Sequence, residues 1–166
     1  MSLAKLGAAV AGTTATAVAG GFGIKCAIDQ QQPTTLVGEE GYSGTDNSKY
    51  GQKRASLLMS TTAERNKPFW EQRVKKLVEG SSFSLVAESY FKTNFETKLN
   101  DYKTNKMDET KLKAAVDELK SNCKSKYDET ATALKTADKS KWEEFWRFCS
   151  VSGEVPSDLD NDLTSP

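Results

Sequence analysis

The feature that limits the fold of this sequence most is a series of apolar stripes at helical spacing, between residues 60 and 149. One stripe runs from Trp70 to Val78, with apolar side chains at the three- and four-residue intervals that share one helix face. Similar stripes run through residues 83–105, 108–134 and 140–149. Alternating strand patterns are absent from this region. We therefore predict an all-α domain, a small four- or five-helix bundle over residues 59–150.

Residues that start and stop helices set the expected ends of these elements. Pro68 suits a first turn, where its missing N–H is not needed, and Gly80 suits a C-terminal cap. The patterns that begin at Thr61 and at Ser140 have a Glu three residues on, as in a capping box. Asp108 is the expected cap of the third helix.

A run of 19 uncharged residues, Leu6–Ile24, precedes this domain. As a helix it is long enough to cross a bilayer at about 1.5 Å per residue, although Ala and Gly dominate it. It has three interpretations: an uncleaved signal anchor, a signal peptide cleaved before Gly20, or a soluble Ala/Gly segment. We predict that residues 1–26 are a signal anchor or signal peptide, with membrane contact through residues 6–24.

Two further segments lack an apolar period. Residues 27–58 are polar, broken by Pro33 and rich in Gly, and are predicted to form a flexible linker. Residues 151–166 carry four acidic groups and no basic one, which predicts a disordered acidic tail.

Composition argues against several classes of function. Twenty-three basic and 23 acidic residues give a net charge of zero, so no excess of charge calls for nucleic acid. The chain has no His, which removes His-based catalysis and His-ligated metals, and three Cys are too few for a four-thiolate site. Acidic pairs such as Glu143 and Glu144 are adjacent, so they diverge on a helix. We expect no enzyme activity, no cofactor, no metal and no nucleic-acid partner.

Cys123 and Cys149 lie on apolar faces of predicted helices, 26 residues apart. They are either joined by a disulfide or reduced and buried as small apolar side chains. We predict the disulfide, which would stabilise the fold by about 3–4 kcal/mol and would require an oxidising compartment. Cys26 would then be the unpaired cysteine.

Several short segments of the chain occur in an order that resembles a known group of proteins. They include Met1–Leu6, Gly41-Tyr42, Leu58–Thr62, Phe69–Arg73, Leu119-Lys120 and Trp146–Val151. This order resembles the large paralogous families of uncharacterised membrane or surface proteins of haemotropic mycoplasmas, wall-less bacteria that live on red blood cells. The resemblance implies an N-terminal membrane or export segment, a helical domain with paired cysteines, surface exposure and antigenic variation. It implies no known activity and supplies no functional residues.

These observations lead to one expected function and one alternative. We expect a membrane-anchored or exported surface protein, located in the cell membrane with an extracellular domain or secreted. It would bind a host or surface protein or act in antigenic display. The alternative is a membrane-tethered structural or assembly module that self-associates into a homo-oligomer through its N-terminal helix. Small residues four apart, such as Ala8 and Gly12, would let two such helices approach closely.

Overall fold

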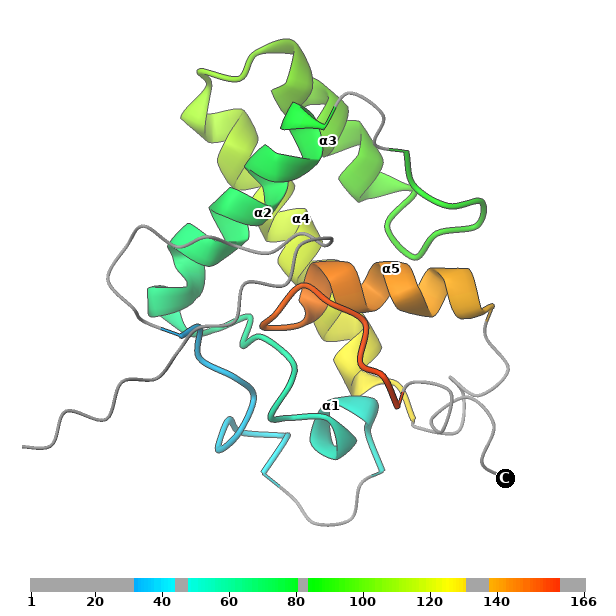
Figure 1. Ribbon diagram of the computed structural model, residues 1–166. Coiled ribbons are helices and arrows are strands. Elements are labelled where there is room, and N and C mark those ends of the chain that lie inside the picture. Colours follow the sequence, from blue (N-terminus) through cyan, green and yellow to red (C-terminus); the bar gives the residue numbers. More distant parts are fainter. Residues whose placement is uncertain (1–31, 44–47, 81–83, 131–137, 159–166) are drawn as a thin grey trace, which may run out of the picture.

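The computed structural model describes residues 32–43, 48–80, 84–130 and 138–158 (Figure 1). Its elements, in chain order, are α1 (Tyr50–Lys53), the 3₁₀ helix η1 (Glu64–Asn66), α2 (Lys67–Glu79), α3 (Asn94–Thr104), α4 (Glu109–Asp128) and α5 (Lys139–Cys149). Within these residues there are five α-helices and only isolated β-bridges. The prediction of a helical bundle is therefore confirmed for the described part of the chain. The predicted N-terminal helix within residues 1–26 lies outside it.

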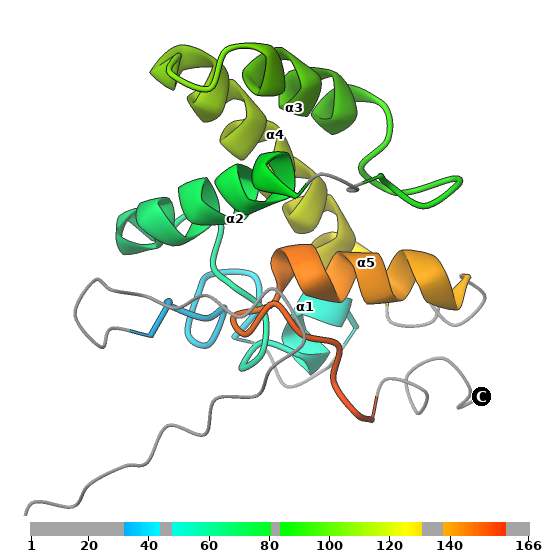
Figure 2. The ribbon, with the colours of Figure 1, turned by 45° about the horizontal axis from the view of Figure 1, so that its top comes forward.

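The longest helix, α4, is the centre of the bundle and contacts α1, α2, α3 and α5 (Figure 2). Its buried face carries Leu112, Ala115, Val116, Leu119, Cys123 and Tyr127. Asp108 caps its start as predicted, because its carboxylate accepts hydrogen bonds from the backbone N–H groups of Thr110 and Lys111. The apolar stripe and the cap together position α4 against the rest of the domain.

Helix α2 begins one residue before Pro68 and ends at Glu79, with Gly80 as its C-cap, as the sequence predicts. The capping-box predictions at Thr61 and Ser140 are wrong. Ala63 precedes the first 3₁₀ turn, and Asp138 caps α5 by accepting from the Ser140 N–H at 2.8 Å. Because α5 starts at Lys139, Ser140 lies inside its first turn and donates to the cap.

Residues 84–93 do not form the helix that their apolar spacing predicts, and α3 begins only at Asn94. The carboxylate of Glu144 on α5 accepts hydrogen bonds from the Val86 N–H and the Ser89 hydroxyl. Glu88, between them, has a φ of 59°, which a right-handed helix does not allow. The segment is therefore held by long-range contacts to α5 and not by the backbone hydrogen bonds of an α-helix.

The prediction of a flexible linker is wrong for residues 32–43 and 48–58. Leu36, Tyr42, Tyr50 and Leu58 are all buried in the core, and α1 forms within this segment. The large side chains are spread too irregularly along the sequence to give a helical or a strand period. Residues 27–31 and 44–47 lie outside the described part.

The two ends of the described chain meet on either side of residues 57–60. The Ser60 N–H donates to the Thr34 carbonyl, and the Met59 N–H donates to the Cys149 carbonyl, both at 2.9 Å. The Val151 N–H donates to the Leu57 carbonyl, also at 2.9 Å. We call residues 33–37, 57–60 and 149–158 the base of the domain. In both views the turn between α3 and α4 lies at the top, and the base lies below α2, on the side of α1 (Figures 1 and 2).

The prediction of a disordered tail fails for residues 151–158, which belong to the base. Val155 packs against the core, and Asp158 forms an ion pair with Arg54 at 2.8 Å. Short-range charge composition suggested a solvated segment, but these contacts come from residues far away in the sequence. Residues 159–166 lie outside the described part.

Candidate functional site

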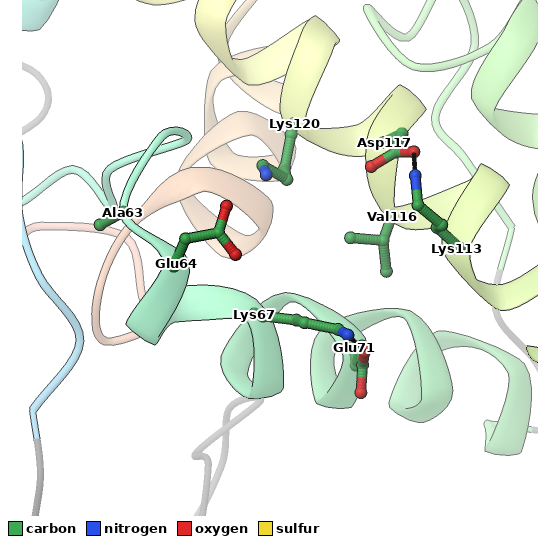
Figure 3. Close-up of a pocket in the computed structure, with 8 residues that line it drawn as sticks. All are labelled: Ala63, Glu64, Lys67, Glu71, Lys113, Val116, Asp117 and Lys120. Atoms are coloured by element: carbon green, nitrogen blue, oxygen red, sulfur yellow. Dashed lines mark hydrogen bonds and ion pairs between the residues drawn. The ribbon is translucent and has the colours of Figure 1, made fainter.

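Two adjoining pockets follow the line where α2 meets the first half of α4. One has a volume of about 210 Å³ (Figure 3) and the other a volume of about 300 Å³. They share Lys67, Glu71 and Lys113. The first is completed by Ala63, Glu64, Val116, Asp117 and Lys120, and the second by Glu109 and Thr110. We call this surface the α2–α4 groove.

Both helices bring charged side chains to the groove because its walls are their solvent-facing flanks. The first pocket is lined by three lysines and three acidic residues, so its charges balance. Val116 points into it from the buried face of α4 and is 6% exposed (Figure 3). The groove thus combines an apolar floor with a rim of both charge signs.

The ion pairs in the groove form within each helix. Lys67 pairs with Glu71 on α2 at 3.9 Å, and Lys113 pairs with Asp117 on α4. Glu64 and Lys120 lie together at the other end of the pocket (Figure 3). The structure shows no ion pair for either of them. This end of the groove therefore carries one carboxylate and one ammonium for which no ion pair is recorded.

The electrostatics of the groove favour the charged form of Lys113. The hydrogen bond with Asp117, followed by its charge, raises the pKa of Lys113, so this amine stays protonated at neutral pH. A general base or amine nucleophile needs a lowered pKa in a lysine. Among the described residues, no group of His, Cys, Asp and Glu side chains has the geometry to hold a metal ion.

The two cysteines singled out from the sequence come together in the core, away from the groove. Cys123 on α4 and Cys149 at the end of α5 are joined as a disulfide, with their Cα atoms 5.6 Å apart. Both are completely buried. The predicted pairing is confirmed, and it links the central helix to the base.

Arg73 is a buried polar residue that sequence reasoning missed. Its Nη1 donates hydrogen bonds to the carbonyls of Arg147, Phe148 and Ser150 at 2.8–2.9 Å, at the end of α5. Its Nε and Nη2 have no hydrogen-bond partner, and burial lowers its pKa to about 10. The available signal was its position three residues after Trp70, on the apolar stripe of α2. Arg73 therefore stabilises the base and is not part of the groove.

Glu144 is a second buried polar residue that sequence reasoning missed, and it is 4% exposed. Burial raises its pKa, although the hydrogen bonds from Ser89 and Val86 act in the opposite direction. Its sequence signal was its place between Trp142 and Phe145 on the most apolar of the helices. It fixes residues 84–93 to α5 and has no contact with the groove in the structure.

A third polar cluster ties the N-terminal part of the described chain to the end of α4. Asp128 accepts hydrogen bonds from Tyr42, Lys49 and Lys124 at 2.7–3.0 Å. Burial, with the hydrogen bond to Asp128, raises the pKa of Tyr42 to about 12. Burial alone would raise the pKa of Asp128, but these hydrogen bonds together lower it. The cluster is a structural contact between residues 42–49 and α4.

Comparison of the chain with known protein families, with curated proteins and with solved structures finds no match in any of the three. Among the described residues, no helix has both the length and the apolar character needed to span a bilayer. The uncharged run Leu6–Ile24 lies outside these residues. The geometry of the described domain is thus the basis for a functional proposal.

Proposed function

We propose that this chain is a membrane-anchored or exported surface protein whose helical domain acts by binding or by antigenic display. The observation that carries the proposal is the buried disulfide between Cys123 and Cys149. Disulfides persist in oxidising environments, whereas a bacterial cytosol keeps thiols reduced. A disulfide at the junction of α4 and the base is expected in a domain that folds outside the cytosol.

The sequence before the domain agrees with this location. The 19 uncharged residues Leu6–Ile24 are long enough for a membrane helix, and Lys5 precedes them. The same run supports the alternative, a tethered assembly module, because its small residues recur four apart. The anchor and the disulfide therefore point to one location by independent physical arguments.

The α2–α4 groove is the surface that we propose for a partner. It offers an apolar floor at Val116 and the free charges of Glu64 and Lys120. A protein surface with both charge signs fits such a rim, because opposite charges across an interface set orientation and specificity. We propose no enzymatic activity for the groove, where Asp117 holds the Lys113 amine in its protonated form.

Protease treatment of intact cells, followed by fractionation and thiol counting, tests the location. We expect the added protease to reach the protein from outside the cell and to cut the chain before the folded domain. We also expect the protein to be found with membranes or in the medium, and to have one free thiol when denatured without reductant. Protection from the protease together with three free thiols would overturn the proposal. A cytosolic enzyme assayed in parallel controls for lysis.

Substitution within the uncharged run separates an anchored protein from a soluble one. Replacing Val10 and Val18 by Lys introduces two charges into the run, which are costly in a bilayer. The variant is expected in the soluble fraction after a carbonate wash. The matched control replaces Ala9 and Ala17 by Leu, which keeps the run uncharged and should retain it in the membrane pellet.

A further inference from the structure

The chain enters the described domain at a point held by a buried amide. The Thr34 N–H donates to Asn66 Oδ1, and Asn66 Nδ2 donates back to the Thr34 carbonyl, both at 2.7 Å. Asn66 Nδ2 also donates to the Ser60 carbonyl at 2.9 Å, and Asn66 is completely buried. Pro33, immediately before, is buried as well. The entry point of the chain into the base is therefore fixed.

This fixed point leaves a short connection to the uncharged run. Only eight residues, 25–32, lie between Ile24 and Pro33. Fully extended, they reach about 28 Å at about 3.5 Å per residue. A domain of the length described has a radius of gyration of about 14 Å, which corresponds to a diameter of about 36 Å. The connection is shorter than the domain is wide.

We infer that the base is a lipid-facing surface, with the turn between α3 and α4 directed away from the membrane. The inference rests on the proposed function, because it takes Leu6–Ile24 as the anchor. With a connection of about 28 Å, the domain cannot turn over and bring the far end of α3 and α4 to the bilayer. The base lies away from that turn, on the side of α1 (Figures 1 and 2).

The apolar side chains of the base support lipid as the occupant. In the described part of the chain, the large apolar side chains that are exposed are Val37, Leu57 and Met107. Two of them, Val37 and Leu57, belong to the base and flank the backbone contact between Leu36 and Leu58. Leu57 also borders a hollow of about 350 Å³, whose wall combines Val155, Pro156 and Trp146 with three serines and Glu154. The exposed side chains of Val37 and Leu57 would gain from leaving water at the headgroup boundary.

The charges near this hollow indicate which lipid contact it makes. Glu154 lines it, and Asp158 nearby is already paired with Arg54. The structure places no unpaired basic side chain in the wall of the hollow, so anionic headgroups have no charge to attract them there. The contact is therefore apolar, and it should form on uncharged phosphatidylcholine and persist in high salt.

The test uses the full chain with Cys26→Ser, inserted into phosphatidylcholine vesicles. One variant adds Leu57→Cys and the other adds Met107→Cys, and each new thiol carries an environment-sensitive fluorophore. Leu57 is 39% exposed and Met107 is 91% exposed, so both sites accept a label. We expect a nitroxide on the lipid headgroup to quench the label at position 57 at least about twofold more than the label at 107, because quenching requires proximity to the lipid surface.

The outcomes separate this inference from the proposed function. Failure of the full chain to float with the vesicles would overturn both the anchor and the lipid-facing base. Flotation with equal quenching at the two positions, or stronger quenching at 107, would overturn the orientation alone. Flotation with loss of the position-57 quenching in high salt would overturn the apolar contact. A Gly/Ser insertion of about 20 residues after Gln32 is the matched control, and it should reduce the quenching because a longer tether lowers the effective concentration.

Discussion

Arg73 on α2 donates a hydrogen bond to the carbonyl oxygen of Phe148 at 2.9 Å, and so joins the second helix to the end of the last one. The same Nη1 reaches the carbonyls of Arg147 and Ser150. A cation at the C-terminus of a helix is favourable because the last carbonyls have no intrahelical partner. The contact holds α5 in place where it enters the base.

Arg73→Ala should lower the free energy of unfolding by about 2–4 kcal/mol, because it leaves a cavity and three carbonyls without their donor. Arg73→Lys should cost less, since one ammonium can still donate. Urea unfolding followed by circular dichroism measures both. Arg65→Ala, at an exposed position of η1, is the control and should leave the midpoint unchanged. Equal midpoints for the variants at 73 and 65 would contradict this role.

Gly51→Ala should destabilise the domain by about 1–3 kcal/mol through overpacking. A Cβ at this position would lie 2.7 Å from two ring carbons of Tyr42 and 2.9 Å from the Cβ of Tyr127. The melting temperature of this variant should therefore be well below the melting temperature of the wild type. Ser56→Ala, at an exposed position nearby, should not change it. A wild-type melting temperature for Gly51→Ala would show that residues 42–51 do not pack as described.

The buried carboxyl of Glu144 should make stability depend on pH with a definite sign. Burial raises its pKa above the ordinary value of 4.5, so the folded state binds this proton more tightly than the unfolded state. Its contribution to stability is complete below the unfolded pKa and is lost as pH rises through the folded pKa. The stability of the wild type relative to Glu144→Gln should therefore fall as pH increases from about 4 to about 7.

Asp128→Asn provides the contrast for that measurement. Hydrogen bonds from Lys124, Lys49 and Tyr42 lower the pKa of Asp128 despite its partial burial. Its contribution is present above the unfolded pKa of 3.8 and is lost as pH falls through the folded pKa. The free energy of unfolding of the wild type, relative to that of Asp128→Asn, should therefore decrease as the pH is lowered. If the stability difference between wild type and Glu144→Gln changed with pH in the same direction as the difference between wild type and Asp128→Asn, the opposite pKa shifts of Glu144 and Asp128 would be contradicted.

Limited proteolysis tests the extent of the domain. Residues 33–58 should stay attached to the protected fragment, because Leu36, Tyr50 and Leu58 are buried in the core. Mass spectrometry should find a fragment from about residue 33 to about residue 158. A first stable fragment that begins near residue 58 would instead support a flexible linker.

The parts of the fold that could be predicted are those with a local signal. The stripe from Trp70 to Val78 and the cap at Asp108 each lie within one helix, and their effects depend on neighbours three or four residues away. The segment from Val86 to Phe91 has a similar spacing but is fixed by Glu144, more than 50 residues later. Local periodicity carries no information about such a contact.

The candidate site was beyond prediction for the same reason. Glu64 and Lys120 come from different elements, and only the packing of α2 on α4 brings them to one pocket. The glycines before residue 58 indicate a linker when only the local sequence is considered, yet Gly51 lies where a Cβ would collide with Tyr42 and Tyr127. The cysteine pair could be found because both members lie on strong apolar stripes.

The hydrogen bonds that hold residues 57–60 between the two ends of the described chain also constrain when the protein can fold. Leu58 is paired with Ser150, so the early segment reaches its place only after the ribosome has made residues near 150. Contacts of such long sequence separation form late and slowly. Before that point, Met59 cannot donate to the Cys149 carbonyl and Leu57 cannot accept from Val151. The base therefore stays incomplete until almost all of the described domain has been synthesised.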